Sequence, residues 1–301
     1  MAIAWMFLPQ TKNVFGPAIR DQYVSMNREI LCLRNPWIAD SVFMGKMYAA
    51  SNCLMFFFFT WQFALLLNEP GQSLGFDLFL WVYLGCTTAF TAFIGALIWY
   101  RIFFIKRLSH LYFNRQTQKV YYQRNKTLIA FDWAQTEGGL YPRTEFGGSS
   151  FSISYALAFG PKPADGNEKN RITLWVDSNE PTESDLRHVA EVWEYIRQFM
   201  AHGPDKLPPP GEPNWWRIPL HRICLSPAEA WRHYAPWRTG EPGELQGKNN
   251  WMLPFWLVLF PYNLFSALCW CVVCRVFNVR TAEPPVEALE SQKSLMDTSK
   301  D

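Results

Sequence analysis

Three cysteines lie close together near the C-terminus, and their spacing is that of a metal-binding cluster: Cys269, Cys271 and Cys274. The stretch around them is apolar and contains no histidine or acidic residue that could complete a ligand set. The other cysteines, at positions 32, 53, 86 and 224, do not form the framework of a secreted disulfide protein. We therefore interpret the three as small apolar side chains of a lipid-facing or packed helix, and we expect no metal and no cofactor.

Acid–base chemistry is the second kind of chemistry to consider, because Asp132, Glu137 and Glu145 could form paired carboxylates. Asp132 follows a predicted strand and fits an edge or turn position. The five histidines show no ligand spacing, and His188 is expected to be solvated beside a helical apolar stripe. No nucleophile elbow, phosphate loop, zinc-protease helix or dinucleotide turn is present. We therefore expect a protein that is not an enzyme.

Two stretches without charged side chains, residues 47–68 and 78–100, are separated by about nine residues. Each exceeds the roughly 20 residues that a helix needs to cross a hydrocarbon layer about 30 Å thick. The sequence therefore predicts a transmembrane helical hairpin over residues 47–106. Because these stretches contain no ionisable residue, the charged pathway of a pump or transporter is not expected.

Small and polar side chains of the two stretches are expected to join the helices. Small residues let helices approach closely, so Gly85, Ala89, Ala92, Gly95 and Ala96 should face the first helix or another chain. The polar side chains should make hydrogen bonds between helices; these are Asn52, Thr60, Gln62, Thr87, Thr88 and Thr91.

Basic residues predict the orientation. Lysine and arginine occur on both outer flanks of the hairpin, at Lys12, Arg20, Arg28, Arg34, Lys46, Arg101, Lys106, Arg107, Arg115 and Lys119, whereas the connecting loop has none. Because basic residues stay on the cytoplasmic side, both flanks should be cytoplasmic. The start of the chain has no basic n-region or long apolar h-region, so we expect no cleaved signal peptide. The formal net charge of only +2 gives no indication of a nucleic-acid partner.

The segment 107–205 is predicted to be a cytoplasmic α+β domain. Alternating or β-rich runs predict strands at 110–115, 118–124, 127–134 and 171–176, and, after a Gly-Gly-Ser-Ser turn within 146–159, over SFSISYALAF at 150–159. A helix should follow over 182–200, with Thr182 as its N-cap. Its apolar stripe consists of Leu186, Val189, Trp193, Ile196 and Met200. This order of elements is that of a pleckstrin-homology-like fold, an antiparallel sheet with a C-terminal helix.

The remaining segments are less regular. Residues 1–46 form a cytoplasmic N-terminal segment in which 20–40 is a strand or a surface helix. Residues 206–248 form a Pro/Trp-rich linker with a juxtamembrane helix that begins at the capping box Ser226–Glu229.

The third charge-free run, 249–274, is interrupted by Pro254 and Pro261. Its sequence is compatible with a transmembrane span and with a re-entrant or interfacial segment. Residues 275–301, and 281–301 in particular, are expected to form a disordered tail.

One stretch carries a resemblance to a known family. Residues 112–133, YFNRQTQKVYYQRNKTLIAFDW, contain an Asn-Arg-x-Thr turn, a Lys-Val-Tyr strand and a later Asp-Trp. This pattern resembles a family of uncharacterised proteobacterial inner-membrane proteins with a transmembrane hairpin before a cytoplasmic domain, often encoded beside type VI secretion effector genes. The resemblance covers the layout of residues 15–200. It implies a multi-pass bacterial inner-membrane protein with an immunity or effector-accessory role, and it supplies no catalytic residues.

Two function hypotheses follow. In the first, the protein binds a toxin, effector or secretion protein; the expected contact residues are Trp215, Trp216, Arg217, Trp231 and Arg232. The same Trp-rich segment has an alternative interpretation as an interfacial membrane anchor. In the second hypothesis, a tethered domain senses membrane lipids through headgroup contacts of Arg115, Lys119, Arg124 and Lys126. Both hypotheses are compatible with a homo-oligomer.

Overall fold

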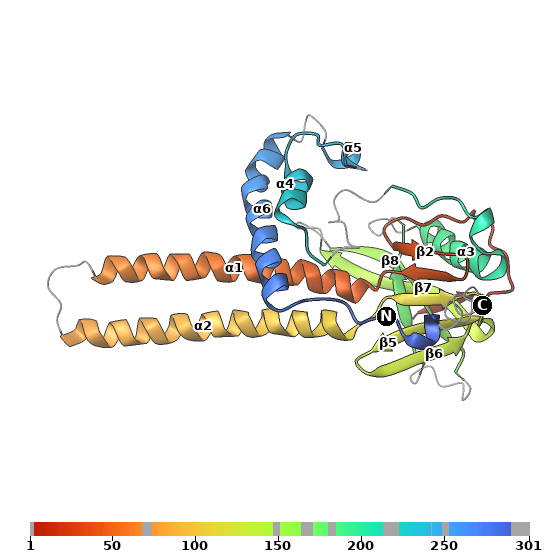
Figure 1. Cartoon of the computed structure of the whole chain (residues 1–301), viewed down its shortest axis with the longest axis horizontal. Helices are drawn as coiled ribbons and strands as arrows, with labels where there is room; N and C mark the ends of the chain where they lie inside the picture. Colours follow the sequence, from red (N-terminus) through yellow and green to blue (C-terminus); the bar gives the residue numbers. More distant parts are fainter. Residues whose placement is uncertain are drawn as a thin grey trace, which may run out of the picture. The chain divides into compact units, whose positions relative to one another are not determined.

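The structure is a computed structural model of the whole chain, and it combines helices with two antiparallel sheets, an α+β mixture (Figure 1). It describes residues 3–67, 74–146, 151–163, 171–179, 185–212, 223–241, 243–248 and 253–289. The chain forms two compact units. We call them the sheet unit (residues 1–39, 107–221 and 281–301) and the helix unit (residues 40–106 and 222–280).

The sheet unit contains one sheet of four strands and one of five. The first has the order β1-β7-β8-β9, with β1 (Ala4–Phe7), β7 (Thr136–Phe146), β8 (Phe151–Pro161) and β9 (Leu174–Asp177). The second has the order β2-β3-β4-β5-β6, with β2 (Tyr23–Met26), β3 (Ile30–Leu33), β4 (Leu111–Asn114), β5 (Lys119–Arg124) and β6 (Thr127–Asp132). Every pairing is antiparallel, so each sheet can bury one face.

The N-terminal segment belongs to these sheets. It supplies β1, β2 and β3, so residues 20–40 contain strands, one of the two expected alternatives. The long strand β7 was not predicted, because Gly138, Gly139 and Pro142 interrupt its apolar pattern. Gly138 has a packing role: a Cβ atom there would lie 2.7 Å from the Trp193 ring.

Helix α3 (Leu186–His202) covers the sheets. Its N-cap lies three residues later than expected: Asp185 is the N-cap in place of Thr182, because the Asp185 side chain accepts a hydrogen bond from the Arg187 backbone N–H. Thr182 itself lies outside the described residues. Trp193 is only 1% exposed, as predicted, and its ring centroid lies 5.0 Å from that of Trp133. Leu186, the first member of the stripe, is 45% exposed.

Residues 281–289 of the C-terminal tail lie against the sheet unit, where disorder was expected; residues 290–301 lie outside the described residues, and the expectation for them stays a prediction. Ala288 is fully buried, and its carbonyl oxygen accepts a hydrogen bond of 3.0 Å from Asn114 Nδ2. The tail packs on the face of the second sheet that presents Ile30, Cys32, Tyr112 and Tyr121. An apolar sheet face exposed to water is unfavourable, and the tail covers it.

The helix unit contains α1 (Pro36–Leu67), α2 (Leu74–Arg107), α4 (Pro227–Tyr234), α5 (Glu244–Gly247) and α6 (Leu253–Val276). Among the described residues, α1, α2 and α6 are long and apolar enough to cross a membrane, judged by length and composition. From Leu253 onward, the third apolar run is a continuous helix through Pro261.

Helices α1 and α2 lie side by side and meet through aromatic rings (Figure 1). The Phe59 ring centroid lies 6.1 Å from Tyr83 and 6.3 Å from Phe90, and the Tyr83 hydroxyl donates to the Phe59 carbonyl at 3.0 Å. No neighbouring atom lies within 4 Å of a Cβ built on Gly85 or Gly95, and Ala89, Ala92 and Ala96 are exposed. These small residues therefore do not form the contact between α1 and α2, which the aromatic rings make; their contact with another chain stays a prediction.

The hydroxyl groups of this pair also differ from the expectation. Thr60, Thr87 and Thr91 donate to carbonyl oxygens of their own helices, Phe56, Leu84 and Thr87 respectively, and not across the helix pair. A threonine can bond to the preceding turn without any partner helix.

Small residues do permit a close helix contact, but on α1. A Cβ atom on Gly45 would lie 2.5 Å from the Trp270 ring of α6, and Ala49 and Ala50 are 2% and 0% exposed. Trp270 Nε1 donates to the Ile223 carbonyl at 2.8 Å. The closely packed small residues therefore join α1 to α6.

Candidate functional site

Helix α4 begins at the predicted capping box. The Ser226 side chain accepts from the Glu229 backbone N–H, the Glu229 carboxylate accepts from the Ser226 backbone N–H, and Pro227 occupies the first turn. These local signals define the start of α4, and the chain that follows it forms a polar network with a buried ion pair.

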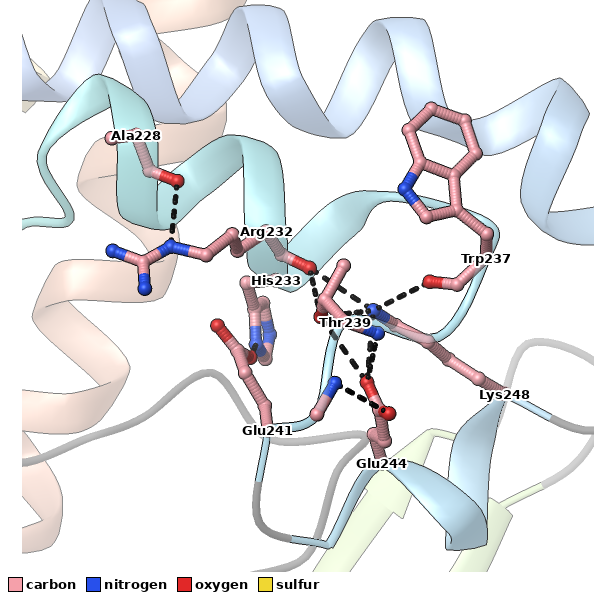
Figure 2. A network of polar contacts seen from close by, with 9 residues as sticks. Ala228, Arg232, His233, Trp237, Thr239, Glu241, Glu244 and Lys248 are labelled. Atoms are coloured by element: carbon pink, nitrogen blue, oxygen red, sulfur yellow. Dashed lines mark hydrogen bonds and ion pairs between the residues drawn. The ribbon is translucent and has the colours of Figure 1, made fainter.

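The Glu244 carboxylate holds the loop after α4 in place (Figure 2). It accepts hydrogen bonds of 2.8 Å from the backbone N–H groups of Thr239 and Gly240. Gly240 has a φ of 81°, a left-handed conformation that favours glycine. The carboxylate thereby fixes a turn that most side chains would disfavour.

Lys248 completes the network from the next helical turn. Its Nζ donates to the carbonyl oxygens of Arg232 at 3.0 Å and Trp237 at 3.2 Å, and lies 3.5 Å from Glu244 Oε2. Glu244 and Lys248 are only 5% and 3% exposed. One ammonium group thus ties the end of α4, the loop and α5 together (Figure 2).

The environment keeps this pair charged and a neighbouring histidine neutral. Burial opposes ionisation of Glu244, but the hydrogen bonds from Thr239 and Gly240 outweigh it and lower the pKa to about 2. Burial lowers the pKa of Lys248, which Glu244 opposes. Burial, with Lys248 and Lys46 nearby, lowers the pKa of His233 to about 4, and its Nδ1 lies 3.2 Å from Glu241 Oε2.

An aromatic surface rests on this network. The Trp231 ring centroid lies 5.7 Å from that of Trp237 and 5.0 Å from that of Phe260 on α6. Trp231 is 46% and Trp237 49% exposed, and Arg232 and Arg238 beside them are also exposed. We call Trp231, Trp237, Phe260 and these two arginines the aromatic platform. Lys248 donates hydrogen bonds to the Arg232 and Trp237 carbonyl oxygens, and these bonds hold the backbone of the aromatic platform in place.

A second buried charge cluster lies in the sheet unit. Asp177, at the end of β9, pairs with Arg143 of β7 and, at 3.5 Å, with Arg34 after β3. The Arg143 guanidinium also lies 4.5 Å from the Trp175 ring centroid. Burial, with Arg34 nearby, lowers the pKa of His110 to about 4.

Two of the predicted partner-binding residues, Trp231 and Arg232, lie in the aromatic platform. The other three, Trp215, Trp216 and Arg217, lie outside the described residues.

The four predicted headgroup residues form two separate pairs. Arg115 and Lys119 flank the turn between β4 and β5, and Arg124 and Lys126 flank the turn between β5 and β6. Lys119 and Arg124 occupy opposite ends of β5, so their backbones are roughly 17 Å apart along the strand. Lys119 also lies 4.0 Å from Asp132. The structure therefore does not gather the four into one basic patch.

The other side chains considered for acid–base or metal chemistry either lie far apart or are engaged in ion pairs. Glu137 and Glu145 are eight positions apart on β7, roughly 27 Å along a strand, and Glu137 binds Arg171 at 2.8 Å. His188 is half-buried, not solvated as expected, with Nδ1 3.6 Å from Glu191. Within the described part of the chain, no group of three His, Cys, Asp or Glu side chains could hold a metal ion.

The sequence interpretation missed the two buried charge clusters. The i,i+4 spacing of Glu244 and Lys248 in a short segment could have indicated the local pair. Arg34, Arg143 and Asp177 lie far apart in the sequence, and no local signal joins them.

The fold and the site define a class of protein: an α+β protein with three membrane-length helices in its described residues. The chain belongs to a family of unknown function, DUF6708, which matches residues 88–284. The match begins within α2 and extends past α6, so it includes the aromatic platform and the Glu244–Lys248 pair. No curated protein and no solved structure matches the chain significantly.

Proposed function

We propose that this is a non-enzymatic membrane protein that binds a protein partner through the aromatic platform. The observation that carries the proposal is the pair of half-exposed tryptophans, Trp231 and Trp237, flanked by exposed Arg232 and Arg238 on a backbone held by Lys248. Trp and Arg dominate interaction hot spots, and a rigid surface loses little entropy on binding.

The membrane anchor in this proposal is a hairpin of α1 and α2. Strand β3 ends just before α1, and β4 begins just after α2. These strands pair directly, with Leu33 opposite Leu111, so both outer ends of the helix pair lie on one side. The basic residues before α1 and after α2 favour the cytoplasmic side of a bacterial inner membrane.

The sheet unit in this proposal has a pleckstrin-homology-like arrangement. Two antiparallel meanders, β4-β5-β6 and β7-β8-β9, precede the single helix α3, and α3 lies against strands of both sheets. A fold alone does not define a function, so the binding role proposed here rests on the aromatic platform and not on this arrangement.

The partner we propose is a toxin or a component of a type VI secretion system, with the protein acting in immunity or effector handling. This identity rests on the resemblance of residues 112–133 alone. The lipid-sensing alternative requires one basic patch, and the separation of Lys119 from Arg124 does not favour it.

The double variant Trp231→Ala/Trp237→Ala tests the platform. In the producing host, crosslinking and purification should recover a secretion or toxin protein with the wild type and at least roughly tenfold less with the double variant, since hot-spot residues contribute about 2 kcal/mol or more. Leu245→Ala, at an exposed position in α5, is the control and should bind normally. Unchanged capture by the double variant would contradict the proposal. Loss of membrane-inserted protein would instead indicate an anchor.

A further inference from the structure

Helix α6 is long enough to span a membrane, yet its first half is tied to one end of the α1–α2 pair. Phe260 of α6 packs against Trp231 of α4, at 5.0 Å between ring centroids. Tyr234 of the same α4 accepts a 2.8 Å hydrogen bond from Lys46 Nζ. Lys46 immediately precedes the charge-free run of α1.

The second half of α6 and the residue that follows it lie at the same end of the helix pair. Trp270 packs on Gly45, next to Lys46. At the C-terminus, the Phe277 ring lies 5.7 Å from Trp99, and the Phe277 carbonyl accepts a 2.7 Å hydrogen bond from Lys106 Nζ, just beyond the charge-free run of α2. Figure 1 accordingly shows α6 crossing the pair instead of running alongside it.

The tail after α6 gives a second, independent argument. Ala288 is buried on the sheet formed by β3, β4 and β5. That sheet is joined directly to the start of α1 and to the end of α2. The chain after α6 has therefore returned to the side on which α1 begins, which a helix crossing the bilayer once would not allow.

The two faces of α6 differ. One face is buried against α4 and α1 and includes Trp256, Ala267, Trp270, Cys271 and Cys274. The opposite face is exposed and apolar, with Leu257, Val258, Tyr262, Val272 and Val276 between 41% and 77% exposed. In Figure 1, α4 lies on the side of α6 away from the far ends of α1 and α2, so the uncovered face is turned toward the span of the helix pair.

We infer that α6 does not cross the membrane but lies in its plane at the cytoplasmic interface, with the uncovered face against the lipid acyl chains. This inference rests on the proposed crossing of α1 and α2. The exposed Arg275 and Arg280 then lie at the headgroups, in accord with the positive-inside preference. The α4 layer, and the aromatic platform with it, lies on the cytoplasmic side of α6.

Reporter fusions to the full chain test the side of the tail. Green fluorescent protein fused after residue 301 should fluoresce, and alkaline phosphatase at the same point should be inactive, because the tail is cytoplasmic. A fluorescent-protein insertion at Lys126, in the turn between β5 and β6, should report the same side. Active phosphatase at the tail together with a cytoplasmic Lys126 would overturn the inference.

A phosphatase insertion at Gly71, between α1 and α2, separates this result from a failure of the proposed anchor. The inserted enzyme should be active. If it is inactive while the tail is cytoplasmic, the crossing of α1 and α2 fails, and with it the membrane placement of α6.

A charge scan provides the second measurement. Leu84→Lys, inside the charge-free run of α2, should reduce membrane insertion on the order of 100-fold, the cost of a lysine at the centre of a span. Tyr262→Lys, near the middle of α6, should reduce insertion less than roughly 10-fold, because an interfacial lysine reaches the headgroups. An equal loss for both variants would show that α6 spans.

Discussion

Two of the buried charge clusters that the structure describes, Asp177 with Arg34 and Arg143 and Glu244 with Lys248, are built on opposite principles. In the sheet unit, Asp177 joins Arg34 and Arg143, three residues that are distant in sequence and that follow or belong to β3, β7 and β9. In the helix unit, Glu244 and Lys248 are one helical turn apart, and they also bond to nearby backbone groups and to the Thr239 hydroxyl.

The difference indicates what each cluster stabilises. Asp177 is the shared partner of Arg34, which follows β3, and of Arg143 in β7, so its loss removes a buried counter-charge that joins distant segments of the sheet unit. Glu244 and Lys248 each keep backbone partners if the other is removed, so the damage should stay within residues 226–248. The first cluster is expected to support global stability and the second a local shape.

The largest expected effect is that of Asp177→Ala. Removing one partner from a buried ion cluster costs roughly 3–5 kcal/mol, so the sheet unit should unfold at a markedly lower temperature in detergent. Asp132→Ala, which removes the exposed partner of Lys119, is the matched control and should change little. A similar melting temperature for both variants would contradict the assigned role of Asp177.

Lys248→Met should have a smaller and more local effect. The Trp237 carbonyl loses its Lys248 donor and the Arg232 carbonyl keeps the Thr239 hydroxyl, which together should cost about 1–3 kcal/mol. Hydrogen exchange measured by mass spectrometry should show faster exchange in residues 226–248 and no change in β3 to β5. Faster exchange in both places would mean that the two clusters are coupled.

Acidification should weaken both units through a different histidine in each. The pKa values of His110 and His233 are lowered from 6.5 to about 4, so the unfolded chain takes up their protons first as the pH falls. Each neutral histidine should make its full contribution to the free energy of unfolding above pH 6.5. Between pH 6.5 and pH 4, each contribution should fall by at most about 1.4 kcal/mol per pH unit. His110→Gln should flatten this dependence in the sheet unit and His233→Gln in residues 226–248, as measured by exchange across pH. If the pH dependence of stability is unchanged in both variants, these histidines are not its cause.

Arg143→Lys should give the smallest effect. Lysine keeps the charge beside Asp177 but loses the planar group over Trp175, which costs about 1 kcal/mol. Thermal unfolding should show a small decrease, and Arg143→Ala should show a larger one. Equal decreases would mean that the stacking and not the charge is the main contribution.

Sequence reasoning identified the elements whose signals are local. The period-two alternation in β8, the β-rich runs of β4 to β6, the buried Trp193 and the capping box at Ser226 depend on neighbouring residues, and each is observed. The apolar length of α1, α2 and α6 is equally local.

Properties that depend on distant segments were not predictable in this way. Nothing near Ala288 indicates that it covers Tyr112 and Tyr121, and β7 lacks an alternating pattern because Gly138 makes room for Trp193. The small residues of α2 have a typical helix-contact pattern, yet Phe59 makes the contact and Gly45 receives Trp270. At the site, the sequence predicted the aromatic and basic residues of the surface. It did not predict the buried Glu244 and Lys248 that hold the segment with Trp231 and Trp237, because their burial is seen only in the structure.

The pairing of β3 with β4 has a consequence for the order in which the protein is made. These neighbouring strands are separated in the chain by both α1 and α2, so the ribosome must complete the two long helices before Leu33 can meet Leu111. The first three strands therefore wait, unpaired with their later partners, while α1 and α2 are synthesised. The sheet is then completed by β4 to β6, and its outer face is covered only when residue 288 leaves the ribosome, after α6. The second sheet is thus begun before the three membrane-length helices of the described residues are synthesised, and it is completed and covered after them.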